Sequence, residues 1–137
     1  DNDADVISMS LGGGAYVSYF DNAINYAVNN GTIVFAASGN DDANYISYPS
    51  AYENCTSIGA LSPCNERKTY SSCDGENFWG SNYGTGLDFV APGVLIHTTS
   101  YTGGYTSNFN GTSSACPLTS HIYHQLRPRT ERFSLAF

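Results

Sequence analysis

One serine stands where the local sequence favours nucleophilic chemistry. Ser113 lies in the segment 110–117, which reads NGTSSACP, so it follows a glycine turn and begins a predicted helix. The positive end of a helix dipole favours the anion that forms during acyl transfer. The alternative is that Thr112 or Ser113 is an ordinary N-cap, as most serines at this position are. Taken alone, the segment favours the cap.

An asparagine amide is the second candidate. Asn40 ends the segment 36–40 (AASGN), directly after an apolar run that predicts a strand. Binding sites in open parallel sheets gather beyond the carboxyl ends of the strands, and an amide there can donate to a developing oxyanion. Gly39 leaves room for a substrate side chain. The alternative is a plain turn in which Asn40 adopts a left-handed conformation.

A third segment carries little side-chain bulk. Residues 10–13 (SLGG) leave a predicted strand in extended form. Such a segment can pair with an extended peptide through backbone hydrogen bonds. The segments 48–52 (YPSAY) and 90–93 (VAPG) are predicted to be rigid turns with no chemistry of their own.

The elements around these segments form an α/β pattern. Residues 4–9 predict a short buried strand, and residues 32–37 predict a second apolar strand. Between them, residues 15–29 have apolar side chains at the three- and four-residue spacing of a helix. This succession describes a right-handed βαβ unit in a parallel sheet covered on both faces. Further strands are expected at 56–60 and 87–90, and a hairpin at 95–99 and 104–106.

Length and charge limit the class of protein. The 137 residues fit one domain, and the formal net charge is −7. Residues 1–126 hold eleven acidic residues against two basic ones, whereas residues 127–137 hold three arginines against one glutamate. An acidic, lysine-poor surface suits a secreted or extracellular protein and argues against nucleic acid as a partner. No run reaches the roughly 18 apolar residues of a membrane helix, so no membrane partner is expected.

The four cysteines predict one disulfide. Cys64 and Cys73 flank a polar loop and form the favoured pair, with Cα atoms about 4.4–6.8 Å apart. A zinc site would need closer cysteines or nearby histidines. The alternative is that all four cysteines are free thiols. Cys55 and Cys116 fall in segments expected to be buried, so we interpret them as unpaired, small apolar side chains.

Taken together, five segments resemble the subtilase family of subtilisin-like serine peptidases in both order and spacing. They are ISMSLGG (7–13), AASGN (36–40), YP (48–49), DFVAPG (88–93) and NGTSSACP (110–117), and the resemblance extends from about residue 4 to residue 117. It implies a subtilisin-like parallel sheet flanked by helices and hydrolysis of protein or peptide substrates.

The resemblance also implies roles for individual residues. Ser113 matches the nucleophile, and Asn40 matches the oxyanion-hole amide that acts with the backbone N–H of Ser113. These two residues are therefore expected to converge on one point. The resemblance implies that Ser10, Leu11 and Gly12 pair with the substrate backbone. It implies that Ala37, Ser38 and Gly39 form a wall of the adjoining specificity pocket. Family members often bind calcium, but no acidic cluster here matches a site, so no cofactor or metal is assigned.

The sequence departs from the family pattern at both ends. The aspartate and histidine motifs of the family precede its Ser-Leu-Gly-Gly segment, and this sequence begins just before that segment. His121 would lie about 12 Å along the helix from Ser113, too far to act as its base. After Pro117 the family has small residues, whereas this sequence has polar and bulky ones that would enter a packed interior. We therefore expect a partial subtilase domain at 1–126 and a divergent basic tail at 127–137.

The resulting prediction is a serine endopeptidase fold that is incomplete at both ends. The missing N-terminal part of the same domain is its expected partner, because the family's triad aspartate and histidine would come from it. The isolated chain should then have little activity. A non-catalytic peptide-binding fragment and a non-functional fragment are the alternatives.

Overall fold

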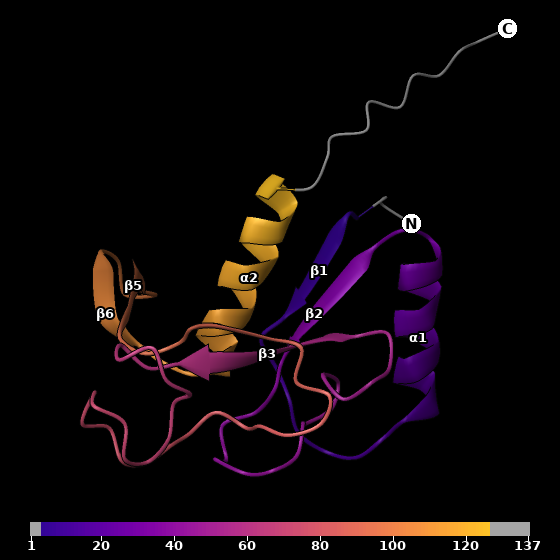
Figure 1. Ribbon diagram of the computed structural model, residues 1–137. Coiled ribbons are helices and arrows are strands. Elements are labelled where there is room, and N and C mark those ends of the chain that lie inside the picture. The colour runs from indigo at the N-terminus through magenta and orange to yellow at the C-terminus, as the bar shows by residue number, and fades with distance from the viewer. Residues whose placement is uncertain (1–3, 127–137) are drawn as a thin grey trace, which may run out of the picture.

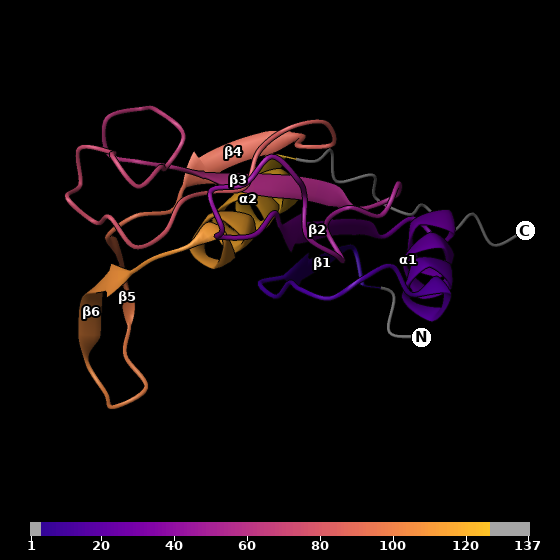
Figure 2. The ribbon, with the colours of Figure 1, turned by 90° about the horizontal axis from the view of Figure 1, so that it is seen from below.

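A four-stranded parallel sheet forms the centre of the computed structural model, which describes residues 4–126 (Figure 1). The strands follow the order β1-β2-β3-β4, and each pair is parallel, as predicted. In chain order the elements are β1 (Val6–Met9), α1 (Ser18–Asn29), β2 (Ile33–Ala37), β3 (Thr56–Leu61), β4 (Phe89–Pro92), β5 (Ile96–Thr99), β6 (Tyr105–Phe109) and α2 (Thr112–Leu126). The antiparallel β5–β6 hairpin projects away from the sheet (Figure 2).

Each face of the sheet is covered by one helix. Side chains alternate along a strand, so Phe35 and Ala37 of β2 face α2 and pack with Ala115 and Cys116. Val34 and Ala36 face the other way and pack in the cluster that includes Ile24 of α1. Both faces of β2 are therefore apolar, which explains why its sequence is a continuous hydrophobic run.

Helix α1 begins three residues later than predicted. Val17 stays extended at φ −132° and ψ 116°, because the Tyr52 hydroxyl accepts from its N–H and donates to its carbonyl, both at 3.0 Å. The helix ends as predicted at Asn30-Gly31, where Gly31 takes a left-handed φ of +87°.

The other boundaries differ by a few residues. Strand β1 begins at Val6 rather than at residue 4, and β6 extends to Phe109. Strand β4 covers 89–92 instead of 87–90. Proline is tolerated at Pro92 because β4 lies at the edge of the sheet, where one row of N–H groups is not needed for pairing.

The second half of α2 does not enter a packed interior, contrary to expectation. His121, Ile122 and His124 are exposed, and only Ser120 in this stretch is buried. Tyr123 is half-buried and lies against Phe35, with ring centroids 5.6 Å apart. The two histidines therefore need no buried partners, and the buried Ser120 hydroxyl donates to the Pro117 carbonyl at 3.0 Å.

The cysteines follow the prediction. Cys64 and Cys73 form a disulfide with Cα atoms 6.4 Å apart, and Cys55 and Cys116 are buried free thiols. Burial raises the pKa of Cys55 to about 12, with smaller contributions from Cys116 and Asp88. Within residues 4–126, no helix is long and apolar enough to cross a membrane. The proposed tail at 127–137 lies outside the described residues.

Candidate active site

A cleft of about 470 Å³ opens where the carboxyl ends of β1 and β2 meet the start of α2. Seven of the eight site residues expected from the sequence line it: Ser10, Leu11, Gly12, Ala37, Gly39, Asn40 and Ser113. The eighth, Ser38, is fully buried and its hydroxyl has no hydrogen-bond partner in the structure. The topology thus brings together three segments that are far apart in the sequence.

Ser113 is held by a reciprocal pair of hydrogen bonds with Ser10. The Ser113 hydroxyl donates to the Ser10 carbonyl at 3.2 Å, and the Ser10 hydroxyl donates to the Ser113 carbonyl at 2.7 Å. That carbonyl is available because residue 117, which would donate to it in a regular helix, is a proline without an N–H. Pro117 thereby couples the first turn of α2 to the segment after β1.

The capping alternative for Ser113 finds no support in this geometry. No backbone N–H of α2 donates to its hydroxyl among the described residues, and the side chain is half-buried at the cleft. The hydroxyl of Ser114, by contrast, is buried and donates to the Gly111 and Gly93 carbonyls. The two adjacent serines therefore differ: the Ser114 hydroxyl is buried against backbone carbonyls, whereas Ser113 lines the cleft.

Asn40 reaches the same turn from the end of β2. Its Oδ1 accepts from the Thr112 backbone N–H at 2.8 Å and from the Thr112 hydroxyl at 3.0 Å. Only the oxygen of an amide can accept these protons, so Nδ2 must point away from Thr112. Thr112 lines the cleft and binds Asn40, whereas the sequence analysis considered it only as a cap.

Gly111 shows where the two expected oxyanion donors lie. A Cβ placed on Gly111 would sit 3.4 Å from Asn40 Nδ2 and 3.6 Å from the Ser113 backbone nitrogen. The amide donor and the backbone donor therefore flank the same glycine. These distances are ordinary van der Waals contacts, but the φ of +118° at Gly111 would strain any other residue at this position.

Asn82 supports the strand end that carries Asn40. It is fully buried, and its Oδ1 accepts from the backbone N–H groups of Asp41 and Ala43. A Cβ on Gly39, at φ +111°, would clash with Asn82 Nδ2. Because its partners lie 39 and 41 positions away, no local pattern in the sequence marked Asn82.

Among the described residues, one carboxylate lines the cleft. Asp41 lines it, and its Oδ2 accepts from the Tyr45 hydroxyl at 2.8 Å and from Asn82 Nδ2 at 3.2 Å. Its hydrogen bonds therefore tie it to the loop after β2 and to Asn82, and it makes no hydrogen bond to Ser113 within the described chain.

No histidine hydrogen-bonds Ser113 among the described residues. His97 of β5 hydrogen-bonds Ser107 and stacks on Tyr105, and His121 and His124 are exposed on α2. None of these histidines hydrogen-bonds Ser113 within residues 4–126. The same part of the chain has no group of three or more His, Cys, Asp or Glu side chains that could hold a metal ion. The cleft thus brings the Ser113 hydroxyl and the Asn40 amide together without a hydrogen-bonded histidine among the described residues.

Comparisons with known proteins find one family model, related sequences and a similar fold. A family model described as "Subtilase family" matches residues 1–134. Alkaline elastase YaB from Bacillus sp. (strain YaB) and subtilisin BL from Lederbergia lenta are each 40% identical over 116 residues, or 85% of this chain. The chain spans only 28% and 39% of the lengths of these two relatives. Among solved structures, the prenylagaramide maturation protease PagA matches with a TM-score of 0.71 at 26% identity, covering 88% of this chain and 42% of that one.

Proposed function

The chain belongs to the subtilase family, and we propose that it is part of a serine endopeptidase in which Ser113 is the nucleophile and Asn40 the oxyanion donor. The observation that carries this proposal is the meeting of Ser113, Asn40 and Ser10 around one cleft. Asn40 contacts the turn before Ser113 across 72 sequence positions, which a simple helix cap does not require.

The geometry supports a specific division of roles. Ser113 Oγ attacks the carbonyl carbon of the scissile peptide, and a base takes its proton and returns it to the leaving amine. Asn40 Nδ2 and the Ser113 N–H donate to the oxyanion of the tetrahedral intermediate. Water then hydrolyses the acyl-enzyme. In this family the base is a histidine oriented by an aspartate, and we place both outside residues 4–126.

The segment after β1 is suited to hold an extended substrate. Leu11 is 59% exposed, and no hydrogen bond joins its backbone to another described residue. Gly13 is fixed by a 2.9 Å hydrogen bond from its N–H to the Tyr48 carbonyl. Backbone groups of Leu11 can therefore pair with a protein or peptide substrate, as in strand addition.

The remaining part of the domain has a place to pack. Strand β1 pairs only with β2 among the described strands, so one edge of the sheet is open. Beside it, a largely apolar cavity of about 550 Å³ lies between the sheet and α1, lined by residues such as Ile7, Met9, Phe20 and Tyr52. Because the relatives are more than twice as long, we propose that an N-terminal part of the same domain covers this edge and supplies the triad histidine and aspartate. We also expect secretion, since disulfides such as Cys64–Cys73 persist in oxidising compartments.

Hydrolysis of a fluorogenic peptide by the full-length protein tests this function. Cleavage that disappears in Ser113→Ala supports it, whereas undiminished cleavage by that variant overturns it. A non-catalytic peptide-binding role is the second candidate, because no histidine hydrogen-bonds Ser113 within the described residues. Peptide binding without turnover in the full-length protein would favour that second role.

A further inference from the structure

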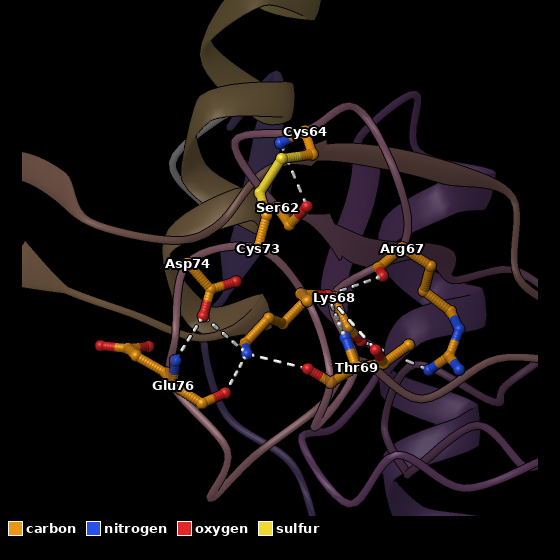
Figure 3. Close-up of a disulfide and its surroundings, with 9 residues drawn as sticks. Ser62, Cys64, Arg67, Lys68, Thr69, Cys73, Asp74 and Glu76 are labelled. Atoms are coloured by element: carbon orange, nitrogen blue, oxygen red, sulfur yellow. Dashed lines mark hydrogen bonds and ion pairs between the residues drawn. A yellow bond between two sulfur atoms is a disulfide. The ribbon is translucent and has the colours of Figure 1, made fainter.

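The loop that the Cys64–Cys73 disulfide closes includes a buried lysine, Lys68 (Figure 3). The Lys68 side chain is fully buried, and its ammonium donates to Oδ1 of Asp74 at 2.9 Å. It also donates to the carbonyl of Thr69 at 2.9 Å and to that of Glu76. Because a buried ammonium is costly unless paired and hydrogen-bonded, these contacts hold the loop in one arrangement.

This arrangement fixes the backbone of Glu76 from two sides. Its carbonyl accepts from Lys68, and its N–H donates to Asp74 Oδ1 at 2.8 Å. Figure 3 shows the Glu76 carboxylate turned away from the ammonium. The side chain of Glu76 is therefore free to bind elsewhere, although the backbone that carries it is tied to the buried ion pair.

The Glu76 carboxylate bridges two groups, one of which belongs to the Ser113 turn. Its Oε2 accepts from the Trp79 indole N–H at 2.8 Å, and its Oε1 accepts from Asn110 Nδ2 at 2.7 Å. Asn110 Oδ1 in turn accepts from the Leu95 N–H at 2.6 Å. Both ends of the Asn110 side chain are thus held, three residues before Ser113.

We propose that Glu76 is a positioning residue for the nucleophile, acting through Asn110; this inference rests on the proposed function. Between Asn110 and Ser113 the chain passes through Gly111, a residue that allows many backbone conformations. The Glu76–Asn110 hydrogen bond fixes the start of this turn, and the Asn40–Thr112 hydrogen bonds fix its end. With both in place, the Ser113 N–H and hydroxyl keep their direction toward the cleft. The structural alternative is that Glu76 serves only to bind Trp79.

A donor–acceptor swap tests this role. In Glu76→Gln the side chain can still accept from Trp79, but its amide then faces the Asn110 amide, donor against donor. In Asn110→Asp two carboxylates meet. The double variant E76Q/N110D restores all three hydrogen bonds, because the introduced glutamine amide donates to the introduced carboxylate and the net charge equals that of the wild type. Exposed Glu53→Gln is the matched control for loss of a charge.

Two readouts on the full-length protein separate the outcomes. Hydrogen exchange of residues 110–115 should become about tenfold faster in each single variant, the factor expected for one lost charge-assisted hydrogen bond, and should return to the wild-type rate in the double variant. The rate at which a fluorophosphonate labels Ser113 should fall in the single variants and recover in the double variant, while E53Q changes neither the exchange nor the labelling rate.

Unchanged exchange in E76Q, or no recovery in the double variant, overturns the proposal. Recovery of exchange without any change in labelling rate overturns the positioning role. If wild-type Ser113 never reacts, the proposed function fails, and the exchange data still decide whether Glu76 orders the turn.

Discussion

The backbone N–H of Thr112 donates to Oδ1 of Asn40 at 2.8 Å, although the two residues are 72 positions apart. This hydrogen bond ties the end of β2 to the start of α2. It also determines which side of the Asn40 amide is available, since Nδ2 must point away from the turn. The amide that the proposed chemistry needs is therefore oriented before any substrate binds, which is the condition for effective electrostatic stabilisation.

Asn40→Ala in the full-length protein should lower kcat about 10²–10³-fold with little change in KM. That magnitude was measured for the equivalent loss in a subtilisin and is applied here by family resemblance. The reason is that the amide binds the oxyanion of the transition state more strongly than the ground-state carbonyl. Exposed Asn44→Ala is the control and should keep wild-type kinetics. An undiminished kcat in N40A, or a loss that appears only in KM, would disagree with this role.

Removing the Cys64–Cys73 disulfide should destabilise the protein by about 2–3 kcal/mol, because the bond closes a short loop in the unfolded chain. Urea denaturation of Cys64→Ser/Cys73→Ser against the wild type measures this difference. Adding a reductant should lower the wild-type stability to that of the double variant and leave the variant unchanged. Equal midpoints for the oxidised wild type and the double variant would contradict the expectation.

The buried Lys68–Asp74 pair should make stability fall in acid. Burial would raise the pKa of Asp74, but the hydrogen bonds from Lys68 and from the Glu76 backbone outweigh it, so the pKa lies below its usual value of 3.8. As pH falls below about 5, Asp74 becomes protonated in the unfolded chain before it does so in the folded protein. The stability that the ionised Asp74 contributes is therefore lost progressively as pH falls through its folded-state pKa.

Asp74→Asn tests this contribution. The variant should lose about 3 kcal/mol at pH 7, because it leaves the buried Lys68 ammonium without its carboxylate. Its stability should also depend less on pH in the range from about 5 to about 3 than that of the wild type. The exposed Glu53→Gln substitution is the control. Parallel pH profiles for D74N and wild type in thermal unfolding would argue against a lowered Asp74 pKa.

The centre of the sheet could be predicted from the sequence because its two central strands are buried on both faces. Residues 33–37 and 56–61 form continuous apolar or small-residue runs, and both became central strands. The start of α1 was misplaced because the helical spacing continues through Val17, whose extended backbone depends on the hydroxyl of Tyr52, 35 positions away. Such long-range contacts leave no periodic signal.

Some residues of the candidate site could likewise be predicted from the sequence, and others could not. Ser113 and Asn40 could be found because each lies in a recognisable short segment. Ser113 follows a glycine turn before a helix, and Asn40 lies in a small-residue turn after a strand. Thr112, Asn82 and Glu76 act through partners between 34 and 72 positions away. Because these partners are distant in the sequence, no local pattern distinguishes the three residues, and their contacts are visible only in the fold.

The most direct test of the account is the reaction of Ser113 with a fluorophosphonate, followed by mass spectrometry of the labelled peptide. In the full-length protein, with the rest of the domain present, the probe should modify Ser113, and Ser113→Ala should abolish labelling. The 137-residue chain by itself should stay unlabelled, because no histidine among its described residues hydrogen-bonds Ser113. Labelling of another serine in the full-length protein, or no labelling at all, would contradict the assignment of Ser113 as the nucleophile.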